Sequence, residues 1–414
     1  MTEQGRKPFE GDMLNRREYA KGLLGFIDRL DSGVIAIDGE WGSGKSWLGD
    51  NLKRSIDEAA SAATVWIDAF EADWDDDPSL SLIASIASQT GGFNKEVWLK
   101  EVASCLVRLI PAGAKAAAQV AGNFTGINNE VVSGLSEAIK DSSNAYIEGR
   151  LHDLADKQKT LIHLKGLLAK AVNETPANKV IVFIDELDRC SPSYAIRFLE
   201  RLKHIFDIEH IIYVIFWNRL QIQNAVEVFY GSGTNGEMYL DKFIDFPLHL
   251  PRSHVRGGDG PMNGLLNSLV MRFDGIERSA LVENIRWLNS VSTLLSLTAR
   301  EAERLARWWV MSPNRNLVVL ETWLLGLKVK RPNLFANIRD EGVSAHLEAK
   351  ELLQSLPAEE NLSRVIAAVI DIHDRYHRND FEGLDQDVEH ILGRVYSDYR
   401  SVIPAAIRRL ETFT

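Results

Sequence analysis

The sequence predicts an α/β protein with a mostly parallel sheet, a large helical insertion and an all-helical C-terminal region. Three observations support this fold class. Short runs rich in Val, Ile and aromatic residues have the length and composition of buried strands. Segments with apolar residues at helical spacing lie between these runs, which favours parallel strands covered by helices on both faces. After residue 251 the sequence offers no comparable strand run.

Five apolar runs are expected to form the strands of the sheet, each buried on both faces. Residues 193–206, SYAIRFLERLKHIF, illustrate the helical spacing of the segments between them. The five runs are VIAID at 34–38, TVWIDAF at 64–70, KVIVFID at 179–185, HIIYVIFWN at 210–218 and FIDFPLHL at 243–250.

The connection between the second and third runs predicts an inserted subdomain. It is about 110 residues long, whereas a simple crossover between parallel strands needs a dozen or more. Its apolar spacing predicts helices at 77–89, across 95–124 and at 144–172. We therefore expect one domain over residues 1–251, including a helical insertion at 71–178. A helical region at 252–414 would act as a lid and interaction tail.

The composition is that of a folded protein of a reducing compartment. The chain of 414 residues is 45% hydrophobic and 25% charged, and Cys105 and Cys190 have no spacing typical of a disulfide framework or metal site. A net charge of −11 argues against broad attraction to nucleic acid. The N-terminus MTEQGRKPFEGD has no apolar core like that of a secretion signal, so we expect a cytoplasmic location.

Residues 102–122, VASCLVRLIPAGAKAAAQVAG, are the nearest approach to a membrane span. Arg108 and Lys115 interrupt the apolar run, and charged groups in hydrocarbon are costly. We expect a helix pair that is buried or amphipathic, with membrane contact as the less favoured alternative.

The stretch GEWGSGKS, residues 39–46, predicts a phosphate-binding loop. It matches G-x-x-x-x-G-K-[ST] in full and lies between an expected strand and the helix SWLGDNLKRSI. Glycines let successive backbone N–H groups turn inward around phosphate, and the helix N-terminus adds partial positive charge. The alternative is a glycine-rich turn without a ligand. The expected nucleotide-binding residues are Gly39, Glu40, Trp41, Gly42, Ser43, Gly44, Lys45, Ser46 and Trp47.

Within this loop, Lys45 is expected to lie on the solvent-facing side and to reach the β and γ phosphates. The Ser46 hydroxyl would complete the shell of a Mg²⁺ ion. The strand end VIVFIDELDRC at 180–190 supplies the second half of such a site. Asp185 would hold Mg²⁺ directly or through water, and Glu186 would orient or deprotonate the attacking water. Alone, each acid is better explained as a loop or capping residue; next to a complete phosphate loop, the catalytic explanation is favoured.

Other polar residues are candidates for sensing or neutralising phosphate charge. Asn218 and Arg219 follow the fourth run in IFWNRL, and Arg300 and Arg304 lie in LTAREAERLAR at 297–307. In related NTPases a polar residue at the end of the fourth strand senses the γ-phosphate, and arginines from a lid or a neighbouring subunit neutralise developing charge. Surface solvation and helix-face salt bridges are the alternative.

These residues together resemble the KAP family of P-loop NTPases. The resemblance rests on the Trp within GEWGSGKS, on VWIDAFEADWDDDPSLSLI, on VIVFIDELDRCSP and on YLDKFIDFPLHLP, with a weaker match in LETWLLGLKVKRPNLFANI. It covers about residues 15–340. It implies a P-loop NTPase fold, ATP and Mg²⁺ as cofactors, and Lys45, Glu186, Asn218 and Arg219 as catalytic residues. FWNRL departs from the family, which usually has an Asp before the Arg.

The resemblance leaves more than one function open. Bacterial members of the family are associated with phage exclusion and defence, and animal members with membrane-linked scaffolds. We expect an ATP-hydrolysing switch of a bacterial antiphage complex that acts with protein partners or as a homo-oligomer. A separate effector protein would supply any nuclease activity. The alternatives are a nucleotide-binding scaffold with little turnover and, less favoured, a small-molecule kinase.

The segment DIHDRYHRND at 371–380 superficially resembles a metal cluster. His373 and His377 are four residues apart on one helix face, but HExxH and a matched acid are absent from this segment. We expect a polar helix end rather than a metal site.

Overall fold

The computed structural model divides the chain into two compact units, each with its own core. The first comprises Met1–Glu10, Arg16–Glu40 and Gly44–Pro251, and the second comprises Gly11–Asn15, Trp41–Ser43 and Arg252–Thr414. The structure describes residues 7–73, 78–89, 98, 100–102, 104–105, 109, 154–251, 261–271, 278–311, 318–340, 342–354, 363–380, 400 and 402–411.

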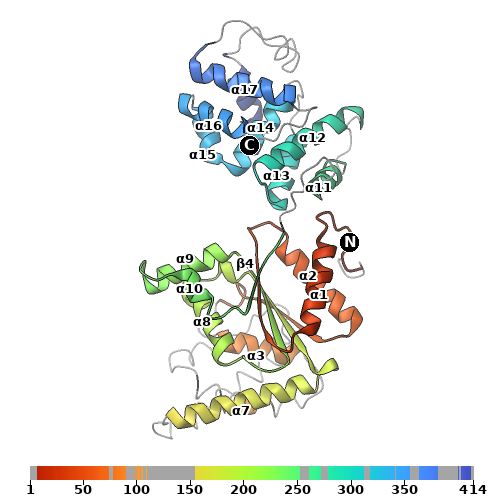
Figure 1. The fold of residues 1–414 in the computed structure, drawn as a ribbon, viewed down its shortest axis with the longest axis vertical. Helices are drawn as coiled ribbons and strands as arrows, with labels where there is room; N and C mark the ends of the chain where they lie inside the picture. The colour runs from red at the N-terminus through yellow and green to blue at the C-terminus, as the bar shows by residue number, and fades with distance from the viewer. Residues whose placement is uncertain are drawn as a thin grey trace. The chain divides into compact units, whose positions relative to one another are not determined.

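The first unit is built on a sheet of five parallel strands (Figure 1). The strands lie in the order β2-β3-β4-β1-β5, so β4 separates β1 from β3. The carboxyl ends of all five strands therefore meet at one edge of the sheet. The strands are β1 (Gly33–Asp38), β2 (Ala63–Asp68), β3 (Val180–Asp185), β4 (Ile211–Trp217) and β5 (Phe246–His249).

Helices cover both faces of this sheet, as its apolar strands require (Figure 1). The helices α1 (Arg16–Arg29) and α2 (Lys45–Ala59) share a core with one set of strand residues, which includes Ile35, Phe183 and Phe216. The opposite face, which includes Val182 and Ile215, packs against α3 (Pro78–Gln89), α7 (Leu154–Asn173), α8 (Pro192–His204) and α9 (Arg219–Tyr230). Three layers result.

The edge strand β5 differs from the prediction. Its four residues alternate between half-buried and exposed, whereas the sequence run at 243–250 was expected to be buried on both faces. The reason is its position, because β5 pairs only with β1 among the described strands. Before it, the short helix α10 (Gly236–Leu240) packs against α9.

The described part of the insertion is helical, as predicted. It contains α3 and α7, and Trp98 donates a hydrogen bond to the backbone carbonyl of Leu167 on α7. Most of residues 102–122, and of the helices predicted across 95–124, lies outside the described residues. In the described part of the chain, no helix combines the length and the apolar character needed to cross a bilayer.

Every regular element described after β5 is a helix. Figure 1 shows these helices gathered into one bundle, whose core contains Trp287, Leu305, Trp323 and Ile372. The helices are α11 (Pro261–Val270), α12 (Arg278–Leu294), α13 (Ala299–Met311), α14 (Val318–Lys330), α15 (Pro332–Arg339), α16 (Val343–Gln354), α17 (Ser363–Arg378) and α19 (Val402–Glu411).

The prediction of a polar helix end at 371–380 was wrong for His373. This residue is fully buried on α17, where its Nε2 accepts a hydrogen bond from the indole Nε1 of Trp323 at 3.0 Å. Its Nδ1 lies 3.0 Å from Nδ1 of His346 on α16. His377 is half-buried, and its Nδ1 lies 3.2 Å from the backbone carbonyl oxygen of Val343. Among the described residues no group of three or more His, Cys, Asp and Glu side chains could hold a metal ion.

Candidate functional site

The phosphate loop follows β1 directly and leads into α2, as the motif requires. Gly42 and Gly44 have φ angles of 79° and 91°, which side chains with a Cβ rarely adopt. Gly49 lies one turn into α2, where an added Cβ would come within 2.9 Å of the rings of Phe216 and Trp66. The absence of a side chain at Gly49 therefore lets α2 lie close against the sheet.

Lys45 is buried, which corrects the expectation that it would face solvent. Only 8% of its surface is exposed. Its Nζ donates to the backbone carbonyls of Gly39 at 2.6 Å and of Glu40 at 3.2 Å, so the side chain closes the loop on itself. Burial lowers the pKa of Lys45. Four carboxylates oppose this shift by attraction: those of Asp188, Asp185, Glu186 and Asp38.

The structure brings Asp185 to Ser46. Asp185 ends β3, is 5% exposed, and accepts hydrogen bonds from the Ser46 hydroxyl and from the backbone N–H of Glu186, the latter at 2.9 Å. Burial raises the pKa of Asp185, and these two hydrogen bonds together with Lys45 oppose the rise. The two predicted Mg²⁺ ligands thus lie in contact although β4 separates their strands.

Glu186 follows Asp185 and has a left-handed backbone, with φ 60° and ψ 19°. Burial raises the pKa of its carboxyl group, Asp185 adds to the rise, and Arg189 opposes it. Its Oε2 forms an ion pair with Nε of Arg189 at 2.6 Å. The carboxylate predicted to act on water is therefore near the loop lysine but is engaged by a neighbouring cation.

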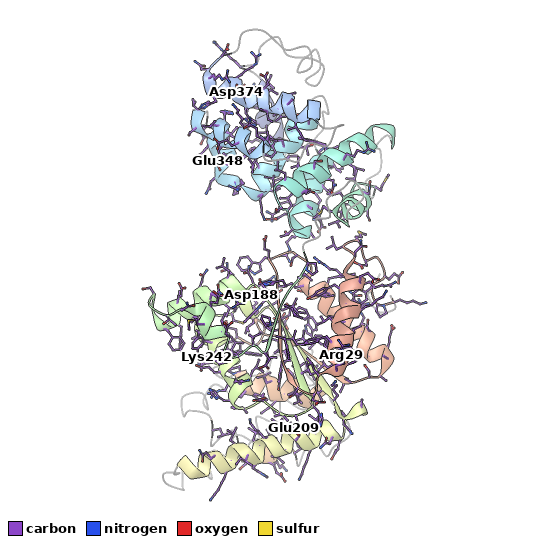
Figure 2. The ribbon with its side chains drawn as sticks, in the orientation of Figure 1. Arg29, Asp188, Glu209, Lys242, Glu348 and Asp374 are labelled. Atoms are coloured by element: carbon purple, nitrogen blue, oxygen red, sulfur yellow. The ribbon has the colours of Figure 1, made fainter. Side chains whose placement is uncertain are left out.

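Asn218 and Arg219 begin α9 at the end of β4, between the strands that carry the loop and the acid pair. The backbone N–H of Asn218 donates to Oδ2 of Asp188 at 3.1 Å, while its side chain does not cap the helix. Figure 2 labels Asp188 at this edge of the sheet. The position suits the predicted sensing role of the Asn218 amide, which stays a prediction.

Arg219 contacts the loop strand through its backbone rather than its side chain. Its N–H donates to Oδ1 of Asp38 at 2.8 Å. Its guanidinium instead pairs with Asp241 at 3.0 Å and Glu237 at 3.4 Å, both on or beside α10. Two carboxylates thus already neutralise this side chain, and its predicted catalytic role gains no support from the structure.

The remaining predicted loop residues have diverse surroundings. The Trp47 ring packs edge-on against Phe9 at a centroid distance of 5.7 Å, and the Phe9 N–H donates to Oδ1 of Asn51 at 2.6 Å. Trp41 is 47% exposed, and the Ser43 hydroxyl is buried. Arg300 and Arg304 lie on α13 of the second unit, so their role at the phosphates stays a prediction.

Sequence reasoning missed two acids at the same edge of the sheet. Asp38 ends β1, and its Oδ2 lies 3.2 Å from Nδ1 of His249. Asp68 ends β2 opposite Asp185 in the strand register, and its Oδ1 accepts the N–H groups of Phe70 and Glu71 at 3.0 Å each. A shared signal could have found them, because the strands β1, β2 and β3 all end in Ile-Asp.

The donor set at this edge fits a magnesium-bound nucleotide. Ser46 and Asp185 offer oxygen ligands, which Mg²⁺ prefers, and the ion usually takes its other ligands from phosphate and water. Two protein ligands are therefore enough. Within the loop, the Lys45 ammonium donates to two neutral carbonyls, where an anion would bind it more strongly. A nucleotide phosphate would supply one.

Comparison with known proteins agrees with this geometry. The sequence profile of the KAP family P-loop domain matches residues 16–271, more than half of the chain. The chain is also similar to the phage T7 exclusion protein of Escherichia coli (strain K12), at 26% identity over 238 residues. That match covers 53% of this chain and 30% of the relative. This chain belongs to the KAP family of P-loop NTPases.

Proposed function

We propose that this protein is a Mg²⁺-dependent ATPase that works as a nucleotide-dependent switch. The observation that carries the proposal is the contact between Ser46 of the phosphate loop and Asp185, with Glu186 next in the chain. A loop that only binds anions has no need of a second acid beside its metal ligand. An ATPase needs one to act on water.

Binding begins with the loop and Lys45. In the chain without nucleotide, the Lys45 ammonium is held by the Gly39 and Glu40 carbonyls and stabilised by surrounding carboxylates. On binding, the ammonium exchanges these carbonyls for β and γ phosphate oxygens, which form stronger charge-assisted hydrogen bonds. The N–H groups at the start of α2 add further donors for the phosphates.

Ser46 and Asp185 would hold the metal. When bound, Mg²⁺ neutralises charge on the β and γ phosphates. The Ser46 hydroxyl and the Asp185 carboxylate, which share a hydrogen bond, would both supply oxygen ligands to the ion. ATP is the default nucleotide because the sequence contains no guanine-recognition motif of the N/TKxD type.

Glu186 would take a proton from the attacking water. Its raised pKa favours this role, because a base with a pKa nearer the working pH is the more effective one. Asn218 would donate its side-chain amide to the γ-phosphate from the end of β4. Asp188, which holds the Asn218 backbone, is the next candidate for the base.

The switch would act in bacterial defence against phage, through protein partners or a second copy of the chain. Similarity to a phage T7 exclusion protein supports this role. The second unit, a helical bundle, offers a body that could report the nucleotide state to a partner or a separate effector. We place the protein in the cytoplasm, in keeping with two cysteines whose spacing suggests no disulfide framework.

A nucleotide-binding scaffold with little turnover is the second candidate function. The ion pair between Glu186 and Arg189 favours it, because a base that stays paired with a cation does not accept a proton readily. In that case ATP would organise partners without being consumed.

Glu186→Gln separates the two functions. It keeps size and polarity but removes the charge, so ATP affinity should persist while turnover falls by about 10² or more. Phosphate release and ATP affinity are measured beside wild type and Glu227→Gln, an exposed control on α9. If wild type with its partners shows no turnover, the protein is a scaffold. Normal turnover in Glu186→Gln together with loss in Asp188→Asn would make Asp188 the base.

A further inference from the structure

The ion pair of Glu186 with Arg189 is built into a single short turn. Glu186 precedes the turn η2 (Leu187–Arg189) and Arg189 is its last residue, and the Arg189 N–H donates to the Glu186 carbonyl at 3.0 Å. The Cys190 N–H closes the turn on the Leu187 carbonyl at 3.3 Å. Leu187 is fully buried, so it anchors the turn in the core. The backbone thus sets both partners in place before any ligand arrives.

The backbone of Glu186 is itself unusual. A non-glycine residue at φ 60° is uncommon and is maintained only where the surroundings determine it. Here the flanking strand β3 is completely buried and the buried Leu187 follows, so both sides of Glu186 are fixed. This conformation directs the side chain into the pair with Arg189 at 2.6 Å.

The pair is strong enough to orient Glu186 but weak enough to open. The side chains are 20% exposed for Glu186 and 40% exposed for Arg189, so water screens their attraction. Partly exposed pairs of this kind contribute little to stability. Because Arg189 is the more exposed partner, an anion from outside could compete for its guanidinium.

The same turn is connected to the position that would sense the γ-phosphate. Asp188 lies between the paired residues and accepts the backbone N–H of Asn218 at 3.1 Å. A shift of Asn218 toward a bound phosphate would therefore pull on the turn that carries the pair. This hydrogen bond gives nucleotide binding a physical route to Glu186.

We propose that Arg189 is a positioning residue that restrains Glu186 in the resting protein, and that turnover requires this ion pair to open. The inference rests on the ATP hydrolysis proposed above. A carboxylate oxygen that pairs with a guanidinium is not available to orient water or accept its proton. Release of Arg189 would return both oxygens of Glu186 to that task and make basal hydrolysis slow until a signal arrives.

Turnover of Arg189 variants tests the restraint. We expect Arg189→Gln to raise kcat by about threefold to fivefold, the range that a partly exposed pair can supply, with KM for ATP unchanged. Arg189→Lys keeps a cation and should stay near wild type. Adding Glu186→Gln to Arg189→Gln should abolish the gain, since Arg189 acts through Glu186. A kcat that is unchanged or lower in folded Arg189→Gln would overturn the restraint.

Chemical labelling tests the pair without any turnover. A carbodiimide and an amine modify accessible carboxylates, and mass spectrometry reads the extent at Glu186, with exposed Glu227 as the internal reference. We expect nucleotide-free Arg189→Gln to be labelled at Glu186 several times faster than wild type or Arg189→Lys. Equal labelling rates in all three would contradict the pair. Faster labelling without ATP turnover in any variant would instead contradict the proposed hydrolysis, and with it the restraint on turnover.

Discussion

Two clusters of buried polar side chains in this protein differ in how their burial is compensated. At the edge of the sheet, Lys45 and Asp185 are less than 10% exposed, and each carries a group that is charged at neutral pH in water. In the helical bundle, His346 and His373 are equally buried but stay neutral. Burial of charge is costly unless it is compensated, so the first cluster has a cost that the second avoids.

The side chains of the histidine cluster form hydrogen bonds with one another and with Trp323. Because Nε2 of His373 accepts from Trp323, its Nδ1 carries the proton and donates to Nδ1 of His346. Tyr376 stacks on the His346 ring at a centroid distance of 4.8 Å. Burial lowers the pKa of His373 to about 3 and that of His346 to about 4, so both rings are neutral at pH 7. We infer a structural role.

The sheet-edge cluster is compensated only in part by its own atoms. Lys45 rests on two neutral carbonyls although carboxylates surround it, and burial shifts its pKa in the direction of the neutral form. Perturbed groups of this kind gather at functional sites, because a ligand supplies the missing compensation. Burial alone does not distinguish a functional site from a structural core. The two clusters differ in whether the protein's own atoms compensate the buried polar groups.

The largest expected effect is that of Lys45→Ala. Loss of the buried ammonium should weaken binding of Mg²⁺-ATP by about 100-fold or more, because a charge-assisted hydrogen bond to phosphate is lost in a poorly solvated loop. Calorimetric titration measures the affinity, and thermal unfolding checks the fold. Lys21→Ala, at an exposed lysine of α1, is the matched control. Unchanged affinity in folded Lys45→Ala would mean that the loop is only a turn.

Asp185→Asn should have a smaller effect that depends on the metal. The substitution keeps the size of the side chain but removes the negative charge next to Ser46, so affinity for Mg²⁺-ATP should fall by about tenfold. Titration of the same variant with ATP and excess chelator serves as the control, and there the affinity should match wild type. An equal loss with and without Mg²⁺ would contradict the assignment of Asp185 to the metal.

The histidine cluster predicts the smallest effect, a loss of stability in mild acid. The folded pKa of both rings lies below the unfolded value of 6.5, so the unfolded chain binds more protons as the pH falls below about 6.5. Each ring should lower the free energy of unfolding by about 1 kcal/mol between pH 7 and 5.5. Urea unfolding of the nucleotide-free protein measures it.

His346→Gln isolates that contribution from other titrating groups. It removes one titrating ring, so the stability of this variant should depend less on pH than that of wild type. The exposed His163→Gln in α7 should keep the dependence of wild type. If His346→Gln loses stability in acid as steeply as wild type, the buried rings are not the source.

The sequence predicted those parts of the candidate site whose residues are contiguous in the chain. The phosphate loop follows from eight consecutive residues, and Asp185 with Glu186 follows from one apolar run. Three other features depend on the folded chain. They are the contact of Ser46 with Asp185, the position of β4 between β1 and β3, and the ion pair of Glu186. Sequence spacing does not report these contacts.

Burial was the least predictable property. Lys45 was expected to face solvent because it belongs to the phosphate loop, yet the loop folds around it. His373 was grouped with its polar neighbours, although it lies on the face of α17 that meets Trp323. In both cases a specific partner receives the buried polar side chain: backbone carbonyls five and six residues away for Lys45, and the indole of a residue 50 positions away for His373.

The missing side chain at Gly49 has a consequence for how this protein can vary. The rings of Phe216 and Trp66 fill the space that a Cβ would occupy, so even alanine would push the start of α2 away from the sheet. Lys45 and Ser46 begin that helix, whereas Asp185 belongs to the sheet. The spacing between the two halves of the nucleotide site is therefore set by an aromatic surface that touches neither phosphate nor metal. Substitutions at Phe216 or Trp66 would adjust the position of the phosphate loop from inside the core.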